Sequence, residues 1–195
     1  MREERLLISE VRAWARSHLS KGRLRHVEGT VRAITRLAAR FGIPASKARL
    51  TAWLHDATKE MTKSQMRVFM RGTPFRWDRH EMRIPALRHS KASAALAWKK
   101  WGVRDRRILL AIAHHPLGIP GMGKLEAALF VADLIEPSRR FRGLADVRKA
   151  CRLGLWRGAE AKAERTLAHL KERGGIIHPR LAKTHEWLKG RKGRK

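Results

Sequence analysis

Residues 50–61, LTAWLHDATKEM, and residues 125–137, LEAALFVADLIEP, decide how this chain folds and where its chemistry lies. In both stretches, apolar side chains typical of a buried helix surround ionisable ones: His55 and Asp56 in the first stretch, Asp133 in the second. Asp133 follows two leucines at one and two helical turns, so its carboxylate projects from the apolar face. A buried charge without a partner is costly. The two stretches therefore predict a shared cation.

The rest of the chain predicts an all-α fold. There is no Tyr, and apolar residues recur at spacings of three and four. Gly42 and Pro44 are stop signals for the second helix, Ser46 is the expected cap of a third helix that continues through residues 53–56, and Thr62 opens a fourth that stops near Gly72. The other expected helices cover about residues 3–18, 24–41, 89–101, 104–115 and 124–135, followed by two more and a short terminal helix.

Length and composition predict one domain. The 195 residues (22.4 kDa) can bury one substantial core, and we expect the domain to cover residues 1–189 with a core of about 20–185. Residues 190–195 are expected to form a disordered basic tail, and residues 72–88, GTPFRWDRHEMRIPALR, an irregular loop that resembles a lid. A single cysteine, no apolar run of about 20 residues and no signal peptide predict a cytoplasmic protein without a membrane span.

The charge is unusual. Lys and Arg number 45 against 17 Asp and Glu, which gives a net charge of +28 and indicates anionic partners. A nucleotide with several phosphates, nucleic acid and an anionic membrane surface all satisfy this inference. Arginines spread over solvated faces would explain the charge equally well.

His26 adds a second imidazole, because it opens a helix with the small residues Gly29 and Thr30 on its side. Two imidazoles and two carboxylates suit a divalent ion such as iron, manganese or zinc, and the lack of thiolate argues against a closed structural zinc site. Iron is the expected ion. Taken singly, each histidine could instead bond a backbone carbonyl, and each aspartate could pair with a basic residue.

The order His, then His-Asp, then Asp, each on its own helix, resembles the HD phosphohydrolase superfamily. The resemblance extends over about residues 20–185 to the YqeK branch, whose members hydrolyse diadenosine tetraphosphate symmetrically to two ADP. It is carried by the segments LRHVEGTVRAITRLAARFGI (24–43), ARLTAWLHDATKEMT (48–62), LRHSKASAAL (87–96), ILLAIAHHPLG (108–118), LEAALFVADLIEPSRRF (125–141) and GGIIHP (174–179). It implies an all-α, compact HD-domain fold.

The resemblance also implies the site. The metal ligands would be His26, His55, Asp56 and Asp133. His89 and His115 match two further histidines of the family, which either bind a second ion or contact phosphate oxygens, so one or two ions are expected.

Four further residues are candidates for contact with the substrate. Lys59 lies one turn after His55, where its ammonium could neutralise a phosphate, although an ion pair with Glu60 or a solvated side chain is the alternative. Arg139, in the family-like EPSRR run, is the best guanidinium for a phosphate. Ile177 and His178, in GGIIHP, would contact base or ribose, but a helix cap followed by a proline-started helix fits the same letters.

These residues predict a hydrolase that cleaves an anionic nucleotide with metal-activated water, with Asp56, Lys59, His89 and His115 as catalytic residues. One alternative keeps the fold and the metal and changes the substrate to another nucleotide or phosphoester. A second alternative is a basic protein that binds RNA or ribosomes and carries a vestigial metal site.

Overall fold

The computed structural model describes residues 2–191 as helices joined by turns, with no strand in that range. The elements are α1 (Arg2–His18), α2 (Lys21–Phe41), α3 (Ala45–Leu54), α4 (Lys63–Met70), α5 (Arg79–Arg83), the 3-10 helix η1 (Pro85–Leu87), α6 (Arg88–Trp101), α7 (Arg106–His114), α8 (Lys124–Ile135), α9 (Leu144–Leu153), α10 (Leu155–Glu172) and α11 (Pro179–Gly190). The predicted all-α class is confirmed.

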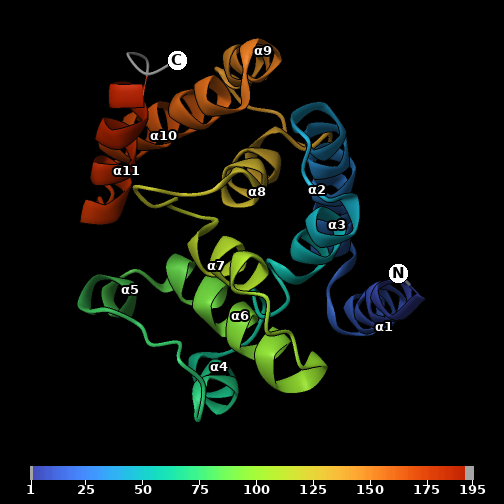
Figure 1. Cartoon of the computed structure of the whole chain (residues 1–195). Coiled ribbons are helices and arrows are strands. Elements are labelled where there is room, and N and C mark those ends of the chain that lie inside the picture. The colour runs from blue at the N-terminus through green and yellow to red at the C-terminus, as the bar shows by residue number, and fades with distance from the viewer. Residues whose placement is uncertain (1, 192–195) are drawn as a thin grey trace.

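Helix α8 is the centre of the bundle (Figure 1). It packs against α2, α3, α7, α9 and α10. A helix that is contacted on several sides must be apolar around most of its circumference, and the run Ala127–Ala132 is buried. Leu129 and Phe130 are fully buried. An ionisable residue of this helix, Asp133, is thereby held in the interior of the molecule.

Helix α2 begins three residues before the predicted start. The Ser20 hydroxyl caps it by accepting a hydrogen bond from the Arg23 amide at 3.2 Å. Its end at Gly42 is as predicted, because the left-handed conformation there (φ 66°) favours glycine. The earlier start brings Arg23 into the first turn, next to His26.

The predicted course of the third helix is wrong at both ends. Pro44, not Ser46, occupies its N-cap position, and no side chain caps the helix. The helix ends at Leu54, so His55 and Asp56 lie in the turn that follows it. Both side chains lie inside the bundle, where they are buried.

Residues 72–88 are more ordered than predicted. The segment contains α5 and η1, because the Asp78 carboxylate accepts hydrogen bonds from the amides of His80 and Glu81, each at 2.9 Å. Glu81 in turn accepts from the Asp78 amide and completes a capping box. The prediction of an irregular loop is therefore wrong for this part of the segment.

Residue 190, the predicted start of a disordered tail, is still helical, since α11 extends to Gly190. Residues 192–195 of that predicted tail lie outside the described residues. Within residues 2–191, no helix combines the length and the apolar character that crossing a membrane requires.

Candidate metal centre

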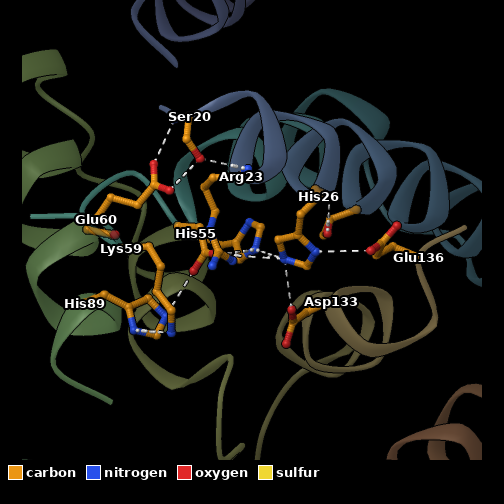
Figure 2. A network of polar contacts seen from close by, with 12 residues as sticks. Ser20, Arg23, His26, His55, Lys59, Glu60, His89, Asp133 and Glu136 are labelled. Atoms are coloured by element: carbon orange, nitrogen blue, oxygen red, sulfur yellow. Dashed lines mark hydrogen bonds and ion pairs between the residues drawn. The ribbon is translucent and has the colours of Figure 1, made fainter. Parts of the chain in front are cut away.

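Five parts of the fold bring together the histidines and aspartates that the sequence singled out (Figure 2). They are α2, the turn after α3, α6, the end of α7, and α8, and they contribute in that order His26, His55 with Asp56, His89, His115 and Asp133. All six side chains are buried or nearly so. We call this set the candidate metal centre.

One half of the centre faces α2. The Nε2 atoms of His26 and His55 lie 3.3 Å apart. Oδ2 of Asp56 lies 3.6 Å from the first nitrogen and 3.7 Å from the second. Asp133 closes this half from α8, with Oδ1 3.2 Å from Nε2 of His26. The facing atoms of His26, His55 and Asp56 lie within 4.8 Å of one another, so one ion could contact all three. Asp133 borders this group through His26.

The other half faces α6 and α7. His89 Nε2 lies 3.0 Å from Oδ1 of Asp56 and 3.2 Å from Nε2 of His115. His115 Nε2 lies 3.8 Å from the same carboxylate oxygen. Asp56 therefore presents one oxygen to each half, as a bridging carboxylate does in a two-ion site.

Backbone carbonyls fix the orientation of two imidazoles. His55 donates its Nδ1–H to the carbonyl of Ala52 at 2.7 Å, and His115 donates to that of Ile112 at 2.8 Å. With the proton on Nδ1, the Nε2 lone pair of each ring points into the centre. This is the arrangement of histidines that ligate metals.

His26 is oriented by a carboxylate instead. Its Nδ1 lies 3.2 Å from Oε1 of Glu136, which also accepts from the hydroxyl of Ser138 at 2.6 Å. The other oxygen of Glu136 lies where a Cβ on Gly29 would be only 2.3 Å away, so this close approach requires glycine at position 29. Glu136 therefore holds the first imidazole in place.

The carboxylates of the centre are ionised. Burial acts to raise the pKa of Asp56, but the neighbouring imidazoles, His55 first among them, and the hydrogen bond from His89 hold that pKa well below its ordinary value. Burial likewise opposes ionisation of Asp133, and the charge of Lys162 is the largest influence that keeps its pKa well below the ordinary range.

The histidines complete the fit to a divalent ion. Burial lowers the pKa of His55 and His115, so both are neutral, as metal ligands must be. Burial also acts to lower the pKa of His26, but the hydrogen bond to Asp133 and the charges of Asp133 and Asp56 raise it overall. Asp133 and Asp56 thus favour positive charge at His26, which a divalent ion would also supply. The nitrogen and oxygen donor set fits an ion of the iron, manganese and zinc group.

Two cations beside the centre were not predicted. Arg23 donates from a guanidinium NH to Oδ2 of Asp56 at 2.6 Å, and Lys162 donates from Nζ to Oδ2 of Asp133 at 3.1 Å. Arg23 lies three residues before His26 on the same helical face, a spacing that could have identified it. Lys162 is on α10, and no spacing in the sequence connects it with Asp133.

Lys59 and Arg139, the two candidates for phosphate contact, both lie beside the centre. Lys59 Nζ is 3.2 Å from Nδ1 of His89, at the edge of the centre (Figure 2). Burial lowers the pKa of Lys59. Arg139 is partly exposed and its guanidinium is 3.6 Å from Oδ1 of Asp133. Its neighbour Arg140 bonds backbone carbonyls of the same loop instead.

His178 belongs to a different set of contacts. With Asp78 and Glu81 it forms a second buried group of potential ligands, the Asp78 group. His178 Nε2 lies 3.2 Å from Oδ2 of Asp78, and its Nδ1 accepts from the Arg180 amide at the start of α11. Ile177 beside it is half-buried. The predicted proline-started helix is present as α11, and His178 is its N-cap. The nucleotide contact of Ile177 and His178 stays a prediction.

Known proteins resemble the chain over nearly its whole length. No family model matches it. Symmetrical bis(5'-nucleosyl)-tetraphosphatases are 33% identical in Bacillus subtilis, over 92% of this chain and 96% of the relative, and 30% identical in Halalkalibacterium halodurans, over 88% and 91%. A solved structure from Clostridium acetobutylicum, described as a predicted HD superfamily hydrolase involved in NAD metabolism, superposes with a TM-score of 0.87 at 27% identity, covering 94% of this chain and 97% of that one. With this identity and coverage, and with the histidines and aspartates of the motif gathered at one centre, the chain belongs to the family of symmetrical bis(5'-nucleosyl)-tetraphosphatases and has the all-α HD-domain fold.

Proposed function

We propose that the protein hydrolyses diadenosine tetraphosphate symmetrically to two ADP, with a divalent ion held by His26, His55, Asp56 and Asp133. The observation that carries this proposal is the convergence of those four side chains, from three separated parts of the sequence, in a chain whose relatives are named for that reaction. When bound, such an ion supplies a hydroxide-like nucleophile from water near neutral pH.

The chain's own residues then act on the phosphates. The oxygen of the water forms a bond to a phosphorus beside the middle bridging oxygen, and the bond from that phosphorus to the bridging oxygen breaks, which leaves two ADP. Lys59 and Arg139 lie at the centre's edge as cations that offset the charge of the phosphates. In the described geometry His89 accepts from Lys59 at Nδ1 and so carries its proton on Nε2. In this geometry that proton faces Oδ1 of Asp56 at 3.0 Å. In a one-ion site His89 would donate it to a phosphate oxygen, and in a two-ion site Nε2 would lose it and bind the second ion.

The two halves of the centre predict different affinities for an ion. The half near α2 has two carboxylates, Asp56 and Asp133, whereas the half near α6 has only the shared Asp56. The first half therefore binds an ion more tightly, because each carboxylate adds charge and an oxygen donor. We propose iron there, with manganese or zinc as the alternatives. Metal analysis of the purified protein gives the identity and the number of ions.

The product pattern tests the substrate. Purified, metal-loaded protein is incubated with diadenosine tetraphosphate, and nucleotides are separated by chromatography. ADP as the sole product supports the proposal. ATP together with AMP, or no turnover, contradicts the symmetric reaction, and turnover of simple phosphoesters at equal or greater rates would favour a different substrate.

A second candidate function follows from a groove between α2 and α9. Four arginines, Arg36, Arg40, Arg148 and Arg152, line this cavity of about 380 Å³ with apolar residues and no acidic one. With the net charge of +28, the groove favours binding of a nucleic acid backbone. RNA affinity that falls steeply with salt and survives Asp56→Ala would support it. The same affinity in a variant with all four arginines changed to glutamine would contradict it.

A further inference from the structure

Lys162 is a buried lysine in α10 to which the proposed reaction assigns no role. Only 2% of the residue is exposed, and such burial of a lysine is rare without partners. Its Nζ has three acceptors: Oδ2 of Asp133 at 3.1 Å, the carbonyl of His115 at 3.4 Å, and the carbonyl of Phe130. An ammonium has three N–H donors, so these acceptors satisfy all of them. The Phe130 ring lies 4.2 Å from Nζ and adds a cation–π contact.

The two carboxylate oxygens of Asp133 have different partners because of the position of Lys162. Oδ2 is held by the ammonium, while Oδ1 faces Nε2 of His26 (Figure 2). The carbonyl of His115, a residue of the other half of the centre, is held by the same ammonium. Lys162 therefore contacts one donor residue from each half and lies behind both.

We propose that Lys162 is a positioning residue that makes Asp133 a ligand with one oxygen and keeps a fixed positive charge beside the ion. This inference rests on the proposed metal centre. Because the ammonium and the ion compete for the same carboxylate, Lys162 weakens the binding of the ion while it fixes the geometry that the reaction uses. Removal of the Lys162 charge would therefore increase the affinity for the ion and decrease turnover.

Lys162→Met tests the proposal, because methionine has a similar shape and no charge. Both proteins are first freed of metal and then titrated with Mn²⁺, with free Mn²⁺ measured by electron paramagnetic resonance. We expect the variant to bind Mn²⁺ about tenfold more tightly or better, because the competing charge is gone. We expect kcat to fall about tenfold with KM within about twofold, because Asp133 then has freedom to turn. Lys171→Met, at an exposed position of the same helix, is the control and should change neither quantity.

A double-mutant cycle shows whether Lys162 acts through Asp133. In an Asp133→Asn background, Lys162→Met should change Mn²⁺ affinity by less than about threefold. A tenfold gain that persists there would overturn the proposal, since the lysine would then act on the ion directly. Unchanged or weaker Mn²⁺ binding in the single variant would also overturn it, because Lys162 would then be only a link between helices.

Two measurements keep these outcomes interpretable. Thermal unfolding of the metal-free proteins checks the fold, and if Lys162→Met does not fold, Lys162→Gln replaces it, since its neutral amide can still donate to Asp133. The wild-type titration separates the two proposals. Absence of Mn²⁺ binding by the wild type would contradict the metal centre itself, whereas wild-type binding with an unaltered variant contradicts only the role of Lys162.

Discussion

The candidate metal centre and the Asp78 group contain the same types of residue, histidines and carboxylates, yet the number of imidazoles differs. Four imidazoles meet in the centre, whereas the Asp78 group has one. In the Asp78 group, Arg180 contacts Asp78 at 2.9 Å and Glu81 at 3.2 Å, and Lys91 contacts Glu81 at 2.6 Å. Side chains alone thus neutralise both carboxylates. In the metal centre, imidazole nitrogens face one another across short distances, and such lone pairs need a proton or a cation between them.

The comparison teaches that residue types alone do not define a metal site. Fixed basic side chains contact carboxylates in both groups, Arg23 and Lys162 in the metal centre. What separates the two groups is that pairs of imidazole nitrogens face one another only in the metal centre. The Asp78 group connects the start of α11 to α5, so its role is to hold two segments together. The metal centre leaves nitrogen atoms and one oxygen of Asp133 directed inward. The predictions below either break this distinction or make it quantitative.

The largest effect is expected for Asp56→Ala. This change removes the only carboxylate shared by both halves, so turnover should fall about 10³-fold or more and the bound metal should be lost. Turnover of diadenosine tetraphosphate and metal content per chain are the measurements. Asp146→Ala, at an exposed position of α9, is the control. Retention of a full complement of metal by Asp56→Ala would contradict the assignment.

Glu136→Gln should have an intermediate effect. The glutamine oxygen can still accept from Nδ1 of His26, but the charge that supports this imidazole is lost, so metal affinity should fall roughly 10-fold to 100-fold. Titration with Mn²⁺ measures it. Glu126→Gln is a matched control, because Glu126 forms a similar contact with His114, at 3.0 Å, outside the candidate metal centre. Equal losses in the two variants would show that the effect is general to such pairs.

Asp78→Ala should affect stability and leave metal content unchanged. Loss of the N-cap and of the contacts to His178 and Arg180 should lower the free energy of unfolding by about 1–2 kcal/mol at pH 7. Burial acts to raise the pKa of Asp78, but hydrogen bonds from the Glu81 and His80 amides and the charge of His178 lower it overall. Because the pKa of Asp78 is lower in the folded protein than in the unfolded chain, the ionised carboxylate stabilises the fold at pH values above the ordinary pKa. This stabilisation is lost as the pH falls through the pKa of the folded state.

The difference in the free energy of unfolding between Asp78→Ala and the wild type should therefore become smaller below about pH 4. Urea unfolding at several pH values measures it, with metal content determined in parallel. If Asp78→Ala lost metal and kept its stability, the Asp78 group would bind metal and would not be a structural link.

The smallest effect is expected for metal removal on the labelling rate of Cys151. This rate distinguishes a protein that has lost only its metal from one that has lost its fold. Burial raises the pKa of this thiol to about 11, so it should react with a thiol reagent at pH 8 about a hundredfold or more slowly than in urea. Metal removal should leave this rate nearly unchanged. Fast labelling of the native, metal-free protein would mean that the ion is needed for the fold around α9.

Much of the fold could be predicted because helix signals are local. The predicted span 124–135 coincides with α8, and Gly42 ends α2 as expected. The predictions of secondary structure were wrong where a local sequence pattern covers only a few residues. Asp78 and Glu81 form a capping box inside a segment that two prolines and mixed charges marked as irregular. Ser46 lost its expected cap position because the helix starts directly after Pro44.

The centre could be predicted only in part. His55, Asp56 and Asp133 stood out because they interrupt apolar helical patterns, and His26 because small residues lie on its side of the helix. The order of the motifs connected the four. Lys162 could not be found this way, since it lies 29 residues after Asp133 and reaches it only through the packing of α10 against α8. Partners that depend on two helices meeting are determined by tertiary structure, and local sequence patterns do not encode them.

The placement of donors on separate helices gives the ion a role in stability. His26 and Asp133 are 107 positions apart, and an ion between them would tie α2 to α8 as a crosslink does. Because the unfolded chain cannot assemble these donors, occupancy stabilises the fold by about 2.7 kcal/mol when the free ion exceeds its dissociation constant about a hundredfold. The melting temperature of this protein would then report the availability of metal in its surroundings.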